Sequence, residues 1–139
     1  MEISKLKKVG STHIGQWVDE IPIRGLEDLK LKVRAIDNVD AIILRTNLIR
    51  ALALEDGDEI SKEDIDRIEV KVLVDAIVVD WNVTADQVPV PFTKDALTEL
   101  LTDPEAGPLM VEACRFASNV VVNRALRDLE SAEKNSETP

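Results

Sequence analysis

The stretch DWNVTADQVPVPFTKDALTELLTD, residues 80–103, carries the clearest local structure in the chain. Its first half predicts that a helix closes at Trp81 and that an extended loop follows over residues 82–91. Pro89 and Pro91 lack a backbone N–H and hold φ at about −65°, so neither suits the interior of a helix or of a central strand. The two prolines therefore predict a connection with a fixed path.

The second half of this stretch predicts a short helix over residues 94–101. Thr93 is a favoured N-cap residue, because its hydroxyl accepts a hydrogen bond from a backbone N–H of the first turn. Phe92 precedes the cap and is placed to pack on Leu97 as a hydrophobic staple. We therefore expect the loop to lead directly into a capped helix.

Downstream, the sequence predicts a turn and then one long helix. Asp103 and Pro104 fit the cap and first position of the turn, and Pro108 begins the long helix. This helix should run to about Ala132, and the polar residues 133–139 should form a disordered tail. The apolar side of the helix is expected at Leu109, Ala113, Phe116, Ala117, Val120, Val121 and Ala125.

Upstream, apolar residues at helical spacing predict two more helices. The first should end near Leu54, and the second should begin after Ser61, which is a good cap. The candidate caps of the first helix are Asp37, Asn38 and Asp40. Its apolar face is expected at Ala41, Leu44, Leu48, Ala51 and Leu52.

The end of the second helix, Val72–Val79, is apolar nearly all round and is interrupted only by Asp75. Such a segment is either a central core helix or a surface that a partner covers. A buried strand is an alternative because Val and Ile dominate the run. The helix is favoured because the run continues the helical spacing that starts at Ile65.

Near the amino terminus the period changes to two. In residues 29–34 the aliphatic Leu and Val residues alternate with Lys and Arg, which predicts a half-buried strand. An earlier strand candidate, Trp17–Ile23, is joined to it through Gly25, so the two should form a β-hairpin. Residues 1–14 are polar and basic and should form a flexible arm.

The elements together predict a mainly α, α+β protein. It has a flexible basic arm over residues 1–14, a β-hairpin over 15–36, a helical domain of about four to five helices over 37–132 and a tail over 133–139. The chain has 139 residues, which is enough to bury a core without disulfides or metals. It lacks a recognisable signal peptide or membrane span, so we expect it in the cytoplasm.

Charge and composition narrow the functional classes. The net charge of −10 and the isoelectric point near 4.6 argue against nucleic acid and anionic membranes as partners. A single cysteine, Cys114, excludes an internal disulfide and agrees with a reducing compartment. We expect Cys114 to be a buried small hydrophobic residue of the long helix.

Residues for catalysis or metal binding are sparse. His13 is the only histidine, so one chain offers no catalytic triad and no multi-histidine zinc site. The loop Glu55–Ser61 resembles a calcium-binding loop only superficially, because the required glycine and bidentate glutamate positions hold Asp58 and Asp64. We therefore expect no enzyme activity, no metal and no cofactor.

The residues of the opening stretch resemble those of phage tail assembly chaperones. The shared signature is a Trp at a helix end, a Pro-x-Pro-Phe-Thr cap and a Leu-Leu helix, formed here by Trp81, Pro89, Pro91, Phe92 and Thr93, with Leu100 and Leu101. The upstream order of a Trp17-containing strand, the strand of residues 29–34 and two aliphatic helices is also similar. The resemblance covers most of residues 16–130, although residues 85–87 replace a linker that usually contains glycine.

This resemblance implies a protein that binds the tape measure protein and presents it to tail tube subunits. It also implies that the chain is absent from the finished virion. A client-binding surface is expected on aliphatic helices, although the same residues can simply pack on one another, and self-association into a homo-oligomer is left open. The candidate residues are Val72, Val74, Val78, Phe116, Val120 and Val121.

Two other functions compete with the chaperone. One is a structural virion component, such as a head-tail connector or a tail subunit, whose arm and hairpin become ordered in a ring. The other is an acidic regulator that mimics nucleic acid. Lys and Arg are interspersed on most of the expected helices, which argues against the regulator.

Overall fold

The computed structural model describes residues 1–137, with side chains described for residues 1–131. The mainly α, α+β class is confirmed. Helices and strands follow in the order α1 (Ile3–Ile14), β1 (Gln16–Val18), β2 (Leu31–Val33), α2 (Val39–Ala51), α3 (Lys62–Val72), η1 (Leu73–Ile77), β3 (Val78–Trp81), β4 (Thr84–Ala85), β5 (Val88–Pro89), α4 (Lys94–Thr102) and α5 (Gly107–Glu137).

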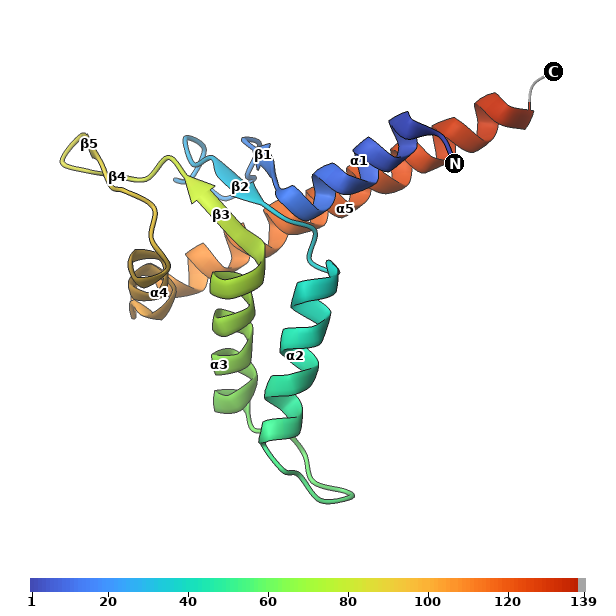
Figure 1. Cartoon of the computed structure of the whole chain (residues 1–139). Coiled ribbons are helices and arrows are strands. Elements are labelled where there is room, and N and C mark those ends of the chain that lie inside the picture. The colour runs from blue at the N-terminus through green and yellow to red at the C-terminus, as the bar shows by residue number, and fades with distance from the viewer. Residues whose placement is uncertain (138–139) are drawn as a thin grey trace.

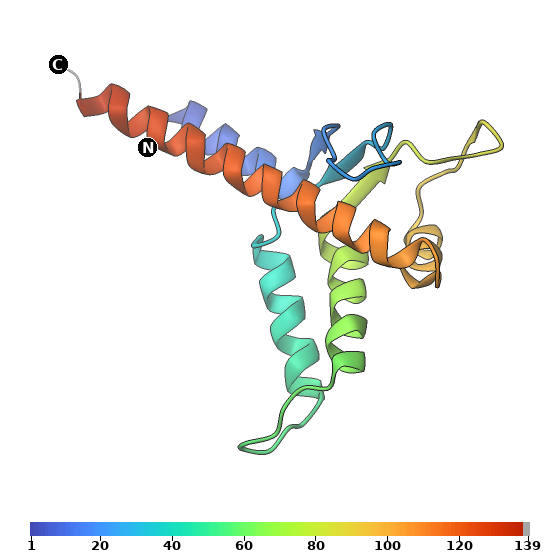
Figure 2. The same cartoon turned by 180° about the vertical axis from the view of Figure 1, so that it is seen from behind.

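The long helix α5 spans the whole molecule (Figure 1). Helix α1 lies beside its C-terminal half, whereas the sheet and α4 lie along its N-terminal half (Figure 2). Helices α2 and α3 lie side by side and project away from α5 in both views. We call these two helices and their connection, residues 39–72, the α2–α3 arm.

Three antiparallel strands form one sheet in the order β1-β2-β3. The predicted β-hairpin is present as β1 and β2, with Gln16 opposite Val33 and Val18 opposite Leu31. Its paired segments are shorter than expected, and residues 19–30 form a long connection. Leu31 and Val33 are buried and Lys32 between them is not, as the alternation predicts.

The third strand corrects a prediction. The sequence favours a helix that continues to Val79, but α3 passes at Leu73 into the π-helical turn η1 and the chain enters β3 after Ile77. The N–H of Arg34 donates to Ile77 O at 2.8 Å, and β2 pairs with β3 beyond this point. Trp81 therefore ends a strand and not a helix. β-Branched residues suit either structure, and pairing with β2 selects the strand.

Residues 3–14 form helix α1, where composition predicts a flexible arm. The N–H of Ala35 donates to Thr12 O at 3.0 Å and ties the end of α1 to the segment after β2. Gly15 ends the helix with a φ of 115°, which residues with a side chain rarely adopt. Packing along α5 stabilises a short segment that would be a marginal helix in isolation.

Helix α5 is longer than predicted. It begins at Gly107, one position before the expected Pro108, and continues past Ala132 to Glu137. The segment predicted as a disordered tail is therefore helical as far as Glu137. Residues 138–139 of that predicted tail lie outside the described residues.

The predicted helix caps are confirmed. The hydroxyls of Thr93 and Ser61 accept hydrogen bonds from first-turn N–H groups of α4 and α3, at 3.0 and 3.1 Å. Asn38 is the cap of α2 among its three candidates, and its Oδ1 accepts from Ala41 N at 3.0 Å.

The predicted loop of residues 82–91 contains a small hairpin in which β4 pairs with β5. Asp86 and Gln87 at its turn have φ values of 49° and 67°, and positive φ at both positions is typical of a type I′ turn. Trp81 Nε1 donates to a carbonyl oxygen of this loop at 2.9 Å. The Trp81 and Phe92 rings meet edge-on with centroids 5.2 Å apart, which fixes the loop against the end of β3.

The turn between α4 and α5 is tightly packed. Asp103 Oδ1 accepts hydrogen bonds from Ala106 N at 2.9 Å and Glu105 N at 2.8 Å, and these bonds lower the pKa of its carboxyl group. A Cβ atom on Gly107 would lie 2.5 Å from Leu101 O, so only glycine fits this position without movement.

Candidate partner-binding surface

The side chains predicted to bind a partner lie mostly inside the chain. Phe116 and Val120 are partly buried against the core. The other four residues are no more than 6% exposed, namely Val72, Val74, Val78 and Val121. The apolar residues of the run Val72–Val79 are therefore core, with the exception of the exposed Val79. This is one of the two alternatives that the sequence left open, and an accessible surface must lie elsewhere.

The residues that resemble the tail assembly chaperone signature lie in and around the connection between β3 and α4. Trp81 is buried, Phe92 packs on its ring and Thr93 caps α4. Pro89 and Pro91 are exposed in the loop. These residues stabilise the fold, as their types predict.

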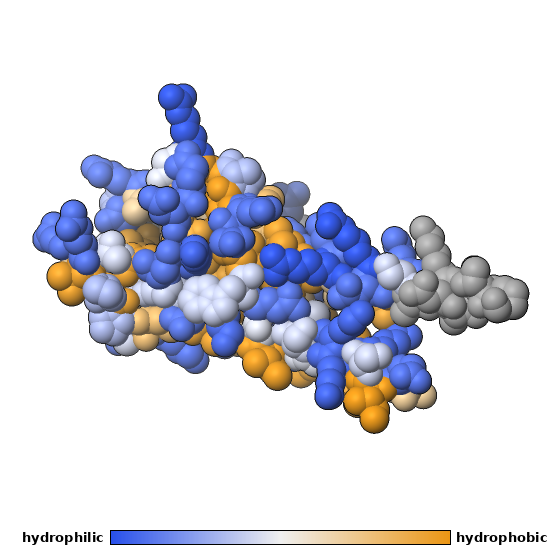
Figure 3. All heavy atoms as spheres, turned by 90° about the horizontal axis from the view of Figure 1, so that it is seen from above, coloured by the Kyte–Doolittle hydropathy of each residue, from blue (hydrophilic) through white to orange (hydrophobic). Residues whose placement is uncertain are grey.

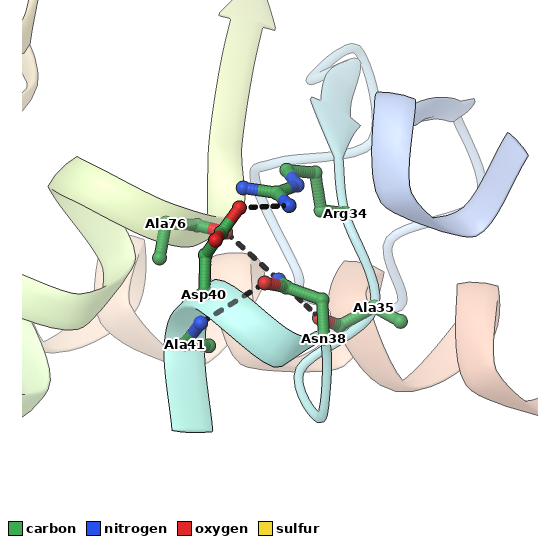
Figure 4. Close-up of polar contacts among 6 residues, drawn as sticks. All are labelled: Arg34, Ala35, Asn38, Asp40, Ala41 and Ala76. Carbon is green, nitrogen blue, oxygen red and sulfur yellow. Dashed lines mark hydrogen bonds and ion pairs between the residues drawn. The ribbon is translucent and has the colours of Figure 1, made fainter. Parts of the chain in front are cut away.

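One buried asparagine joins the α2–α3 arm to the rest of the molecule (Figure 4). Asn38 Nδ2 donates to Ala35 O at 2.8 Å and to Ala76 O in η1 at 2.9 Å, while Oδ1 accepts from Ala41 N. Only 1% of Asn38 is exposed, so water does not compete for these bonds. An aspartate could not replace it, because a carboxylate has no N–H to donate to two carbonyl groups.

An ion pair lies beside this joint. Arg34 Nη2 lies 2.6 Å from Asp40 Oδ2. Figure 4 marks this pair with a dashed line. On the α5 side, Ser118 Oγ donates to Arg34 O at 2.8 Å. The segment after β2 thus contacts both α2 and α5, and these contacts orient the base of the arm.

Helix α2 has a second apolar face that the described residues leave exposed. Its members are Val39, Ile42, Ile43 and Ile49, which are 57, 48, 53 and 37% exposed. We call these four residues the α2 stripe. The opposite face of α2, which includes Leu44, packs on the core and on α3. A line of large aliphatic side chains on a projecting helix is typical of a docking surface.

The isoleucine groove lies between α2 and α3 and ends against α5. It encloses about 270 Å³. The name refers to the six isoleucines that line it, which are Ile36, Ile49, Ile60, Ile65, Ile68 and Ile77. Ile49 also belongs to the α2 stripe, so groove and stripe share an edge.

Charged groups border the isoleucine groove. Arg115 Nε lies 2.9 Å from Glu69 Oε1 across the end of the groove at α5. Arg45 lines the α2 wall and takes part in none of the ion pairs between described residues. The α2–α3 connection, which leads into the groove at Ile60, is acidic and exposed at Glu55, Asp56, Asp58 and Glu59.

A second groove, of about 670 Å³, opens between α2, α3 and α4. We call it the α4 groove. Its apolar lining consists of Leu48, Val70, Val74 and Leu101. Val74 is therefore the one residue of the predicted run Val72–Val79 that borders this groove, although the residue itself is buried. Asp75, further along the run, pairs with Lys71 at 2.8 Å and Lys94 at 3.6 Å.

Titratable groups with shifted pKa values are few and do not gather in one cavity. Burial raises the pKa of the Cys114 thiol to about 12, so the predicted buried position of this residue is confirmed. A hydrogen bond from Gly25 N–H lowers the pKa of Glu27. Among residues with described side chains, no group of three or more His, Cys, Asp or Glu is placed to bind a metal ion. In the same part of the chain, every helix is too short or too polar to cross a bilayer.

Other exposed hydrophobic residues are more dispersed. Figure 3 shows the molecule from the side opposite the α2–α3 arm, where small hydrophobic groups are separated by hydrophilic side chains. On α1, the exposed Ile3, Leu6 and Ile14 lie on one helix face, which is bordered by Lys7. The α2 stripe differs because it lies on the projecting α2–α3 arm and shares Ile49 with the isoleucine groove.

The described residues thus define a small α+β protein with a projecting helical arm that carries an exposed apolar stripe and two grooves. A family model described as YdaY prophage protein matches residues 36–135. This match covers more than half of the chain, so the chain belongs to this family of prophage proteins. No match was found among curated proteins or among solved structures.

The α2 stripe is visible in the sequence if α2 is allowed two apolar faces and not one. Val39, Ile42 and Ile43 stand at i, i+3 and i+4, which is a helix face in its own right. The apolar face around Ala41 and Leu44 masks this second face in the sequence pattern, because α2 is apolar on both sides. The two grooves have no sequence signal, since they depend on how α2, α3, α4 and α5 are placed.

Proposed function

We propose that this prophage protein is a tail assembly chaperone. It binds the tape measure protein in the host cytoplasm, helps to recruit tail tube subunits and is absent from the mature virion. The α2 stripe is the observation that carries this proposal. A chaperone for a long helical client needs exposed apolar helix surface more than it needs a catalytic centre.

Two further observations support the proposal. The Trp81 to Thr93 signature and the order of elements over residues 16–130 resemble tail assembly chaperones. The family match places the chain among prophage proteins, which is the genomic setting in which such a chaperone acts.

Co-expression with the tape measure protein encoded nearby, followed by affinity capture, tests the proposal. We expect the wild-type chain to retain the tape measure protein. A double variant of the stripe, Ile42→Ser with Ile43→Ser, should retain it at least about tenfold less, because each serine removes a large aliphatic contact. The matched control is Val88→Ser with Leu109→Ser, which removes two exposed aliphatic side chains from other elements.

Mass spectrometry of purified particles provides the second measurement. The chain should be absent from mature particles and present in lysates that are assembling tails. Failure to retain the tape measure protein, together with stoichiometric presence in particles, would reject the chaperone and support a structural virion component.

A further inference from the structure

The rim of the isoleucine groove exposes apolar surface on both α2 and α3. Ile49 on α2 and Ile65 on α3 are 37% and 49% exposed, while Ile68 and Ile77, which also line the groove, are buried. A side chain that enters between Ile49 and Ile65 therefore meets apolar groups on its sides and on its floor. An aliphatic side chain suits this space.

Charge changes along the groove. Arg45 lies in its wall with no described acidic partner, whereas the connection Glu55–Glu59 at the outer end of the arm is acidic. A partner that lies along the groove is complementary if a carboxylate sits beside Arg45 and cationic residues reach Glu55–Glu59.

A second copy of the chain fits these charges poorly. Each chain has a formal net charge of −10, so two copies repel one another at long range. The groove therefore favours a different protein.

We propose that the isoleucine groove binds one amphipathic helix of a partner protein. Aliphatic side chains of that helix insert between Ile49 and Ile65, a carboxylate pairs with Arg45, and a Lys- or Arg-rich end lies beside Glu55–Glu59. This inference rests on the proposed function, for which it names the binding site and the chemistry of the bound segment. Helix binding in an apolar groove depends on anchors spaced at i, i+3, i+4 and i+7.

The test uses the full chain with isotope-labelled isoleucine methyl groups and a synthetic helix of about 20 residues. The peptide carries a leucine stripe, one central glutamate and lysines at one end. We expect NMR shifts at the methyl groups of Ile49, Ile60 and Ile65. Shifts confined to Ile3 and Ile14, or no groove shifts at a peptide concentration of about 1 mM, overturn the proposal.

Matched variants test the contacts. Ile65→Glu should weaken the peptide at least about tenfold, whereas Val88→Glu, the same change at an exposed site on β5, should leave affinity within about twofold. Replacing the peptide glutamate by glutamine should weaken binding to the wild type but not to Arg45→Glu. Equal affinity of Ile65→Glu and wild type rejects the groove.

The outcomes separate this inference from the proposed function. If the co-expressed tape measure protein binds wild type and Ile65→Glu equally, the groove is rejected and the chaperone stands. If the peptide occupies the groove but the tape measure protein does not bind, the chaperone is rejected and the groove stands. A wild-type dimer that Ile65→Glu dissociates in sedimentation velocity identifies a second copy as the occupant and overturns the inference.

Discussion

Helices α5 and α2 are both rich in apolar residues, but their surroundings differ. One side of the first half of α5 is fully covered, and Ala113, Cys114 and Ala117 on it have no exposed surface. Helix α2 buries Ala41 completely yet leaves the larger Ile42 and Ile43 about half exposed. The small side chains of α5 let the sheet and α4 approach closely, whereas the described residues leave about half of the surface of Ile42 and Ile43 uncovered.

The buried residues of α5 and the exposed residues of α2 therefore differ in what they contribute to the free energy of folding. Exposed isoleucine contributes little to folding and is a weaker helix former than Leu, Lys or Glu. It also carries a risk of non-specific association. Ile42 and Ile43 are therefore better explained by contact with another molecule than by the stability of α2, while Ala113 and Ala117 are explained by packing alone.

The largest effect expected from this comparison comes from placing the same charge on each helix. Ala117→Asp buries an unpaired carboxylate and should lower the free energy of unfolding by more than about 4 kcal/mol. Ile43→Asp places the carboxylate in water and should cost less than about 1 kcal/mol, mainly through helix propensity. Urea unfolding followed by circular dichroism measures both values. Similar losses in the two variants would show that α2 is covered in solution.

The next largest loss of stability is expected at Asn38, which connects the α2–α3 arm to the rest of the molecule. Asn38→Ala removes the cap of α2 and the side-chain donor to Ala76 O, while Ala35 O keeps only the backbone N–H of residue 38 as a donor, so we expect a loss of about 2–4 kcal/mol. Asn47→Ala on the exposed surface of α2 is the matched control and should change stability by less than about 0.5 kcal/mol. An equally small loss for Asn38→Ala would mean that the joint does not hold the arm.

Local chemistry explains what the sequence predicts well. Thr93, Ser61 and Asn38 act through hydrogen bonds to residues close in the chain, so their roles as caps follow from residue type and position. The strand alternation of residues 29–34 is equally local and predicts the hairpin. The α2 stripe is also a local periodic pattern, with Val39, Ile42 and Ile43 at i, i+3 and i+4, although the apolar face around Ala41 and Leu44 on the same helix masks it.

Long-range contacts explain what the sequence does not predict. Val78 and Val79 fit a helix or a strand, and only pairing with β2 decides between them. The expected apolar side of α5 includes Leu109, which is exposed, and omits Ser118, which is buried. In a helix with small residues on several sides, position relative to the sheet determines which side is covered. The grooves of the arm depend on tertiary placement in the same way.

The smallest changes in the free energy of unfolding are expected from two glycine-to-alanine substitutions, and these changes should have opposite signs. Gly107→Ala at the start of α5 places a methyl group 2.5 Å from Leu101 O, so it should cost about 1–3 kcal/mol. Gly10→Ala in α1 meets no atom within 4 Å and should stabilise the chain by about 0.5–1 kcal/mol, because alanine loses less backbone entropy in a helix. Thermal unfolding of both variants measures the sign. A stabilising Gly107→Ala would show that α5 does not pack closely at its start, and a destabilising Gly10→Ala would show that α1 is covered at that position.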